Sequence, residues 1–284
     1  MSSSYQSPVE LPVDLANPVN GDHDLNRGRV GWWLALPGRY GAPKWYDLCG
    51  KGDGTLTNMT SGTSGWGTGF RQGSLAGQLN FDGSDDYINV GAAPIAAGSA
   101  DLSCFLWARS STGNTGSAQH MVGAYQAGGS FAGWGFAWYY PGNFTIGAWN
   151  GATWTESNTF LFADGAWHRL GFAFRGGVLT FYLDGAPFGG TTVAAPAAWT
   201  GTKAIGSRAD GSFLFTGSLD DVSVWNRGLT DAEALTDFDL SRRGYPGVLN
   251  RLDAGLWMRP PAVVATQYYS WQTAAGGSLW LQAG

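Results

Sequence analysis

The sequence predicts an all-β protein: a β-sandwich with one short helix near its C-terminal end. Large apolar residues alternate along residues 166–185, which is the period of β-strands. Only 13% of the 284 residues are charged, while 14% are aromatic and 45 are glycine, a composition that suits short strands joined by tight turns. A set of helix signals stands at residues 230–246. Length alone does not require a second domain.

Residues 166–185 are expected to form a central hairpin. Leu170, Phe172 and Phe174 alternate with small or polar residues in the first strand, and residues 178–183 form the second. Gly176-Gly177 supplies the positive φ angles of a two-residue turn. Because large side chains stand on both faces, the hairpin is predicted to be covered on both sides.

The other elements follow from the same patterns. Residues 61–69, rich in Gly, Ser and Thr around Trp66, are expected to be a loop. Thr230 and Glu233 form a capping box that starts a helix over residues 231–242, which Gly244 and Pro246 end. Further strands are predicted at residues 30–36, 55–58, 78–81, 87–90, 102–110, 120–125, 134–140, 144–149, 191–194 and 203–206.

Three segments together resemble the laminin-G-like domains of the concanavalin A-like group. They are Trp167-His168 leading to Tyr182-Leu183-Asp184-Gly185, LNFDGSDDYINV at residues 79–90, and FTGSLDDVSVWNR at residues 215–227 followed by Leu229-Thr230-Asp231. Their order and spacing make the resemblance specific.

The resemblance covers residues 30–243 and implies a concanavalin A-like jelly roll with extended terminal arms. We therefore divide the chain into an N-terminal arm (1–25), the jelly roll (26–245) and a β-like extension (246–284). The extension contains two apolar stretches, 263–271 and 278–281. They could add edge strands to the same sandwich or pair with another subunit. The second alternative predicts a homo-oligomer or larger assembly, held by the arm and the extension.

Charge and hydropathy exclude several partners. The net charge of −5 argues against nucleic acid and anionic membranes, and no stretch approaches the ~20 apolar residues of a membrane span. The first 24 residues lack the pattern of a signal peptide. We expect synthesis in the cytoplasm and a final place on a virion surface.

The sequence predicts no catalytic activity. Hydrolases of the resembling group need paired carboxylates on one strand, in a Glu-x-Asp-x-x-Glu pattern. The chain has three glutamates, Glu10, Glu156 and Glu233, and lacks that pattern. No nucleophile elbow and no Cys/His metal cluster is present in the sequence.

Glycan binding is the chemistry that the aromatic stretch from residue 131 to 158 favours. Indole rings stack on the apolar faces of sugars, while amides bond their hydroxyl groups. The alternative is that these tryptophans are core residues. The candidates are Trp149, Asn150, Trp154 and Asn158, together with Trp134 if its face of the strand is open.

No cofactor is expected apart from one candidate, a structural calcium ion. The resemblance implies Asp220 as a ligand, with Asp47 or Asp82 as its partner; ordinary turn chemistry is the alternative reading. Cys49 and Cys104 could pair, but an unpaired, buried Cys104 fits its apolar strand better.

Three functions compete. The first is a non-catalytic surface or attachment subunit, with a bacteriophage decoration, fibre or tail protein as the expected case. Its jelly roll would face outward and bind glycans. The second is a free carbohydrate-binding module, and the third, disfavoured by the missing carboxylate pair, is a glycoside hydrolase.

Overall fold

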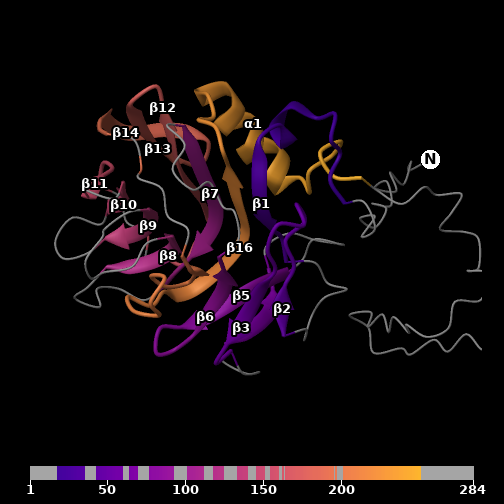
Figure 1. Ribbon diagram of the computed structural model, residues 1–284, viewed down its shortest axis with the longest axis vertical. Helices are drawn as coiled ribbons and strands as arrows, with labels where there is room; N and C mark the ends of the chain where they lie inside the picture. Colours follow the sequence, from indigo (N-terminus) through magenta and orange to yellow (C-terminus); the bar gives the residue numbers. More distant parts are fainter. Residues whose placement is uncertain are drawn as a thin grey trace, which may run out of the picture.

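The computed structural model forms a sandwich of two antiparallel eight-stranded sheets with one α-helix (Figure 1). The all-β jelly roll predicted from the sequence is therefore confirmed. The structure describes residues 18–35, 43–59, 64–69, 77–92, 101–111, 118–124, 133–139, 145–150, 154–159, 162, 164–194, 196 and 201–250.

Sheet 1 has the strand order β14-β13-β12-β7-β16-β5-β4, with β1 paired to β16 beside this path. Its strands are β1 (Arg29–Trp33), β4 (Gly65–Thr68), β5 (Gly77–Asp82), β7 (Leu102–Arg109), β12 (His168–Arg175), β13 (Val178–Leu183), β14 (Ala186–Thr192) and β16 (Thr216–Trp225).

Sheet 2 has the order β11-β10-β9-β8-β15-β6-β3-β2. Its strands are β2 (Lys44–Trp45), β3 (Gly54–Thr57), β6 (Tyr87–Gly91), β8 (Gln119–Ala124), β9 (Trp134–Tyr139), β10 (Thr145–Trp149), β11 (Trp154–Glu156) and β15 (Lys203–Ile205).

The predicted central hairpin is β12 and β13. Its register runs from Leu170 opposite Leu183 to Arg175 opposite Val178, and Gly176 and Gly177 turn the chain at φ 56° and 82°. Most of its side chains are buried on both faces, as predicted.

Alternation along β7 shows how sheet 1 serves two cores. Leu102, Cys104 and Leu106 point into the main core between the sheets. The alternate residues point to the outer face, where Phe105 belongs to a second apolar cluster and Trp107 stacks near Phe238 of the helix. Large apolar residues at both the odd and the even positions of a strand thus indicate that it is buried on both faces.

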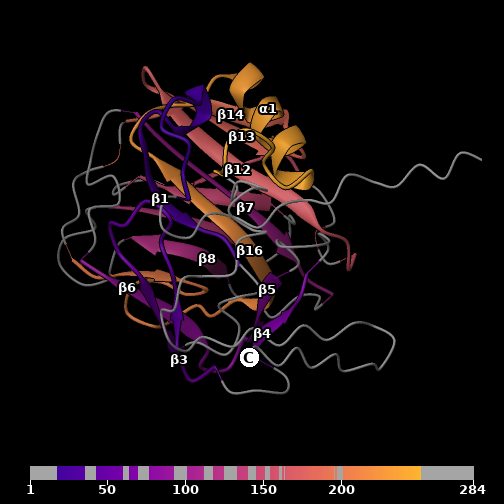
Figure 2. The ribbon, with the colours of Figure 1, turned by 90° about the vertical axis from the view of Figure 1, so that its right-hand side faces the viewer.

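Helix α1 (Asp231–Arg242) covers the outer face of sheet 1 (Figures 1 and 2). Its capping box is present: Thr230 Oγ1 accepts from Glu233 N at 3.2 Å, and Glu233 Oε2 accepts from Thr230 N at 2.9 Å. This confirms the predicted start of the helix. Arg227 adds an ion pair to Glu233 at 2.7 Å.

Charged residues are buried beneath this helix. The Arg169 guanidinium, fully buried, donates to Asp237 Oδ2 at 2.7 Å and lies 3.2 Å from Asp221 Oδ2. Tyr245 Oη donates to Asp221 at 2.6 Å, and Arg29 lies 3.6 Å from Asp237. Two arginines and two aspartates balance in charge, so the network joins β1, β12, β16, α1 and the segment after α1.

Both described chain ends pack against this side of sheet 1. Val19 pairs with Leu249 in an isolated bridge, and Asn20 N donates to Val248 O at 3.0 Å. Val248 and Leu249 belong to a buried cluster with Trp32. The domain boundaries at 25/26 and 245/246 stay predictions, although structured chain continues on both sides of them.

One local prediction was wrong and two were shifted. Residues 65–68 form β4, not a loop, because this segment pairs with β5 along its whole length. The strand expected at residues 191–194 is observed as β14, Ala186–Thr192. The strand expected at residues 30–36 is observed as β1, Arg29–Trp33. The strands predicted at 263–271 and 278–281 lie outside the described residues. No helix in the described part of the chain is long and apolar enough to span a membrane.

Candidate functional site

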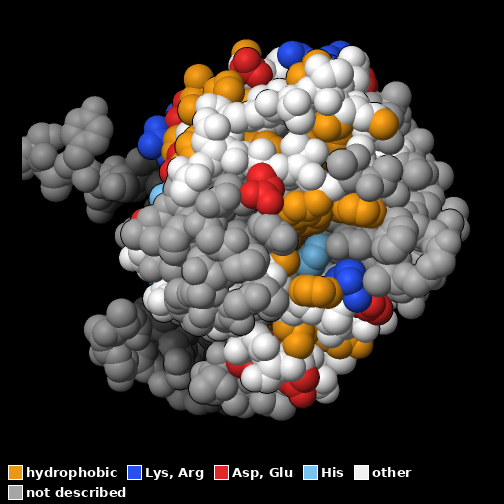
Figure 3. All heavy atoms as spheres, turned by 90° about the vertical axis from the view of Figure 1, so that its left-hand side faces the viewer, with side chains coloured by type: hydrophobic (Ala, Val, Ile, Leu, Met, Phe, Trp, Pro, Cys, Tyr) orange, Lys and Arg blue, Asp and Glu red, His pale blue; other side chains and the backbone are white. Residues whose placement is uncertain are grey.

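The outer face of sheet 2 carries a group of aromatic and polar side chains on the side of the molecule where β9–β11 lie. Figure 3 shows this side, with hydrophobic side chains gathered around a histidine and basic and acidic side chains next to them. We call the group the Trp154 patch; its members are His120, Trp149, Trp154, Glu156, Arg208, Asp210 and Phe213.

Small residues make room for the indole of Trp154. The residues His120, Ala137, Gly147 and Glu156 lie directly opposite one another across β8–β11. A Cβ atom on Gly147 would come within 2.5–2.7 Å of three indole atoms of Trp154, so the ring lies over Gly147. Any side chain larger than that of glycine at position 147 would collide with the indole in this position.

The neighbours of this ring follow from strand register. Trp149 is the direct cross-strand partner of Trp154, and Glu156 is the partner of Gly147. Directly opposite residues point to the same face. The half-buried Trp149, Trp154 and Glu156 therefore share the outer face at the edge of sheet 2.

His120 joins this edge to the loop between β15 and β16. Its ring centroid is 5.8 Å from that of Trp154 and 5.7 Å from that of Phe213. Burial lowers the pKa of His120 to about 3, with Arg208 adding to the effect. The imidazole is therefore neutral at physiological pH and acts as part of the aromatic surface.

The loop that carries Arg208, Asp210 and Phe213 is held by its own hydrogen bonds. Asp210 accepts from Arg208 Nη2 at 2.7 Å, from Arg208 Nε at 3.0 Å, and from Ser212 Oγ at 2.6 Å. Arg208 in turn lies 4.6 Å above the Phe213 ring. These contacts lower the pKa of Asp210 to about 2, against the opposing effect of burial.

Phe213 is exposed and backbone-strained. It lies in the left-handed region at φ 56° and keeps 40% of its surface accessible. Its carbonyl oxygen accepts from His120 N at 2.8 Å, which ties the loop to β8. Such strain in an aromatic residue is typical of functional surfaces. The patch thus presents partly exposed rings beside carboxylates, which is the chemistry of sugar recognition.

The sequence as a whole agrees with this fold. A family profile described as the concanavalin A-like lectin/glucanases superfamily matches residues 82–234, more than half of the chain. The chain belongs to the concanavalin A-like lectin/glucanases superfamily. No curated protein matches it in sequence.

Several solved structures share the superfamily fold at low sequence identity. Domain 4 of AbnA, a GH43 extracellular arabinanase from Geobacillus stearothermophilus, in complex with arabinotriose, aligns with a TM-score of 0.54 and 15% identity, over 73% of this chain and 97% of that one. The binding domain of Paraclostridial Mosquitocidal Protein 1 gives 0.59 and 14%, over 77% and 53%. The botulinum neurotoxin serotype D domain bound to N-acetylneuraminic acid gives 0.55 and 11%, over 75% and 51%. The chain thus spans about half the length of the last two.

The structure places the predicted glycan-binding residues in different environments. Trp149 and Trp154 are brought together as a cross-strand pair. Asn158 is exposed just beyond β11, and its backbone N donates to Phe188 O at 3.4 Å. Asn150 is buried, and its Nδ2 donates to Ala194 O at 2.9 Å, so it supports the chain beside the patch.

Trp134 is a correction. Its inclusion required an open strand face, and that face is closed: Trp134 is 1% exposed and its ring meets Phe172 of sheet 1 edge-on at 5.8 Å. Alternation along β9 placed Trp134, Phe136 and Trp138 on one face but could not say which face is inside. These rings belong to the main core.

His120, Phe213, Arg208 and Asp210 were not predicted as site residues. They come from β8 and from the β15–β16 loop, far from Trp154 in sequence. The one local signal in the sequence is a pair of small residues, Ala137 and Gly147, within the aromatic stretch. At these two positions the strands lack a large outward side chain. Such a gap indicates that another ring occupies the space.

The predicted calcium ligands Asp47 and Asp220 bind backbone N–H groups in the structure. Asp47 accepts from four backbone N–H groups, those of Trp32, Cys49, Lys51 and Gly52. Asp220 is fully buried and accepts from Ala35 N at 3.0 Å. Both carboxylates therefore hold backbone in place, and a calcium ion at Asp220 stays a prediction.

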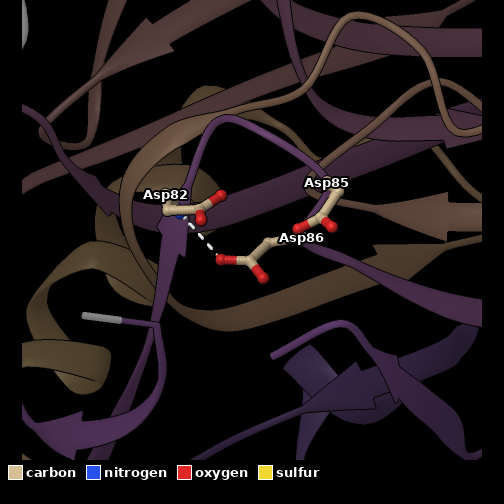
Figure 4. A group of neighbouring side chains, drawn as sticks. All are labelled: Asp82, Asp85 and Asp86. Carbon is tan, nitrogen blue, oxygen red and sulfur yellow. Dashed lines mark hydrogen bonds between the residues drawn. The ribbon is translucent and has the colours of Figure 1, made fainter. Parts of the chain in front are cut away.

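Asp82, the third predicted ligand, lies in a different acidic group with Asp85 and Asp86 (Figure 4). Their carboxylate oxygens lie within 4.8 Å of one another, and oxygen is the donor that hard cations take. The hydrogen bonds of the turn account for this arrangement: Asp82 Oδ1 accepts from Ser84 N and Asp86 Oδ2 from Asp82 N. Burial raises the pKa of Asp86.

The two cysteines are free. Cys104 is buried in the main core, as predicted, and burial raises its pKa. Burial also raises the pKa of the half-buried Cys49 to about 12. Both pKa shifts favour the thiol form at neutral pH.

Proposed function

We propose that this protein is a non-catalytic glycan-binding domain whose Trp154 patch stacks on the apolar face of a sugar. The observation that carries the proposal is the placement of the Trp154 indole over Gly147, in register with Trp149 and beside Glu156. A ring supported from below keeps its geometry without ligand, so little side-chain entropy is lost on binding.

The arrangement of carboxylates supports binding over cleavage. A glycoside hydrolase needs one carboxylic acid and one carboxylate, both able to reach the scissile bond. In the patch, Asp210 is engaged by Arg208 and Ser212, and its pKa lies near 2, so it cannot serve as an acid. Glu156 is then the remaining carboxylate of the patch, which is too few for this mechanism.

The proposal includes display on a larger assembly, with a virion decoration, fibre or tail protein as the specific case. Its support is the arrangement of the chain ends. Residues 18–20 pair with residues 248–250, so the two ends of the described chain lie at one place. That place is on the right of Figure 1, whereas β9–β11 lie on the left. A domain attached there would direct the patch outward.

A glycan array on the purified full chain tests the binding proposal. Wild type should bind a set of glycans for which Trp154→Ala loses roughly five- to thirtyfold in affinity, since stacking of one ring contributes on the order of 1–2 kcal/mol. Trp167→Ala removes a half-buried indole outside the patch, over which Arg109 stacks, and is the matched control. Absence of any saturable binding, or equal loss in both variants, contradicts the proposal. Release of reducing sugar from a bound glycan would contradict the non-catalytic part.

Light scattering tests the assembly role. The full chain should elute as an oligomer, and a chain ending at residue 250 should elute as a folded monomer that keeps glycan binding. A monomeric full chain would contradict attachment through the extension and leave the alternative of a free carbohydrate-binding module.

A further inference from the structure

The fold by itself does not select a sugar class. Among the solved structures above, one domain is in complex with arabinotriose, which is uncharged, and another with N-acetylneuraminic acid, which carries a carboxylate. The choice in this protein therefore depends on the charges that its own patch presents. Those charges can be read from the described residues.

The patch has one cationic side chain, and it is already engaged. Arg208 donates through Nε and Nη2 to Asp210 at 3.0 and 2.7 Å. Its guanidinium also lies over Phe213. Both members of the pair are mostly buried, at 16% and 22% side-chain exposure. A sugar carboxylate would have to compete with Asp210 for the guanidinium edge that best recognises carboxylates.

The other titratable groups of the patch add no positive charge. His120 is 3% exposed and packs between Trp154 and Phe213, and its lowered pKa keeps it neutral. Glu156 adds a carboxylate on the same face, opposite Gly147, over which the indole lies. One arginine and two carboxylates, with a neutral His120, give the members of the patch a net negative charge.

We infer that the Trp154 patch selects uncharged sugars and rejects glycans that carry carboxylate or sulfate groups. This inference rests on the proposed function and names the ligand class of the same surface. A neutral ring stacks on Trp154 and donates its hydroxyl groups to the Glu156 carboxylate. An acidic ring meets that carboxylate as a like charge, and repulsion of this kind sets specificity more than affinity.

Matched glycan pairs test the inference. The probes are galactotriose beside trigalacturonic acid, and lactose beside 3′-sialyllactose, within an array of neutral glycans and their sulfated forms. Where the neutral member of a pair binds wild type, its acidic counterpart should bind roughly five- to tenfold more weakly. Raising the salt concentration should narrow this ratio, because the patch charge is partly exposed.

Three variants locate the cause. Glu156→Gln removes the like charge, and Asp210→Asn releases Arg208 from its carboxylate; each should narrow the neutral-to-acidic ratio by about fivefold. Asp164→Asn removes one exposed carboxylate outside the patch, together with its contact to His168, and is the control for net charge, so its ratio should equal that of wild type.

The outcomes distinguish this inference from the proposed function. Acidic glycans that bind as tightly as neutral ones, with binding lost in Trp154→Ala, overturn the selectivity and leave glycan binding intact. A ratio that narrows equally in Asp164→Asn also overturns it, because the patch charges would then have no special role. No binding of any glycan overturns both.

Discussion

The outer faces of the two sheets use aromatic and charged residues in opposite ways. On sheet 1, Phe105 and Trp107 point outward and helix α1 covers them, above the buried Arg169 network. On sheet 2, small residues such as Ala137 and Gly147 point outward, and a half-buried indole lies over them. The same residue types therefore stabilise the fold on one face and form a candidate ligand surface on the other.

The size of the outward side chains explains this difference. Large apolar side chains on an outer face must be covered, since leaving them in water forgoes about 25 cal/mol per Å² of burial. Once covered by α1, that face can also enclose charges, provided each has partners. An outer face whose outward residues are glycine and alanine exposes little apolar surface. It can therefore stay accessible to solvent without a covering helix.

The largest expected effect comes from breaking the buried network on sheet 1. Arg169→Met should lower the free energy of unfolding by about 3–5 kcal/mol, because Asp221 and Asp237 lose their main partner in a buried site. Urea unfolding measures it. Arg208→Met, the same change in the Trp154 patch, should cost less, about 1–2 kcal/mol, because Asp210 is partly exposed and keeps its bonds from Ser212. Equal losses would show that the two faces do not differ in this respect.

Two glycines allow a sharper comparison. A Cβ atom on Gly171 of sheet 1 would collide with the ring of Phe105, as one on Gly147 would with Trp154. Gly171→Val should cost roughly 1–3 kcal/mol of stability, since Phe105 is enclosed and cannot move away. Gly147→Val should displace the half-buried indole, so that glycan binding falls as far as in Trp154→Ala while stability changes less. The reverse pattern would place Trp154 in the core and not in a binding surface.

A smaller expected effect is the pH dependence of stability, which should differ between a histidine of the Trp154 patch and one of sheet 1. His120, in the patch, has a pKa lowered to about 3, so the unfolded chain binds its proton first as the pH falls below 6.5. Stability should fall by about 2 kcal/mol between pH 7 and pH 5 from this group alone. His120→Asn should remove that slope, measured by urea unfolding at each pH.

His168, at the start of β12, should behave in the opposite sense. Its Nδ1 lies 2.9 Å from Asp184 and its Nε2 3.2 Å from Asp164, and the bond to Asp184 does most to raise its pKa. Its contribution to stability is complete below pH 6.5 and is lost as the pH rises through the raised pKa. NMR titration should show His168 titrating above 6.5 and His120 neutral down to pH 5. If the two histidines titrate at the same pH, burial does not control the pKa of His120.

The sequence predicted most of the strands, the central hairpin and the capped helix because their causes are local. The hairpin needs alternation and two glycines, and the helix needs Thr230 and Glu233 three residues apart. Strand β4 was missed because its stability comes from pairing with β5, which its Gly- and Ser-rich sequence does not signal. Trp149 and Trp154 were recognised because each is an indole with an asparagine nearby in the aromatic stretch from residue 131 to 158.

The sequence by itself thus determined the class of fold, the central hairpin and the chemistry that aromatic residues could supply. Only the tertiary structure decided which side of β9 is inside, which removed Trp134 from the surface. It also decided that His120, Phe213 and Arg208 meet Trp154. Alternation fixes relative direction along a strand, but which face is buried depends on where distant segments pack.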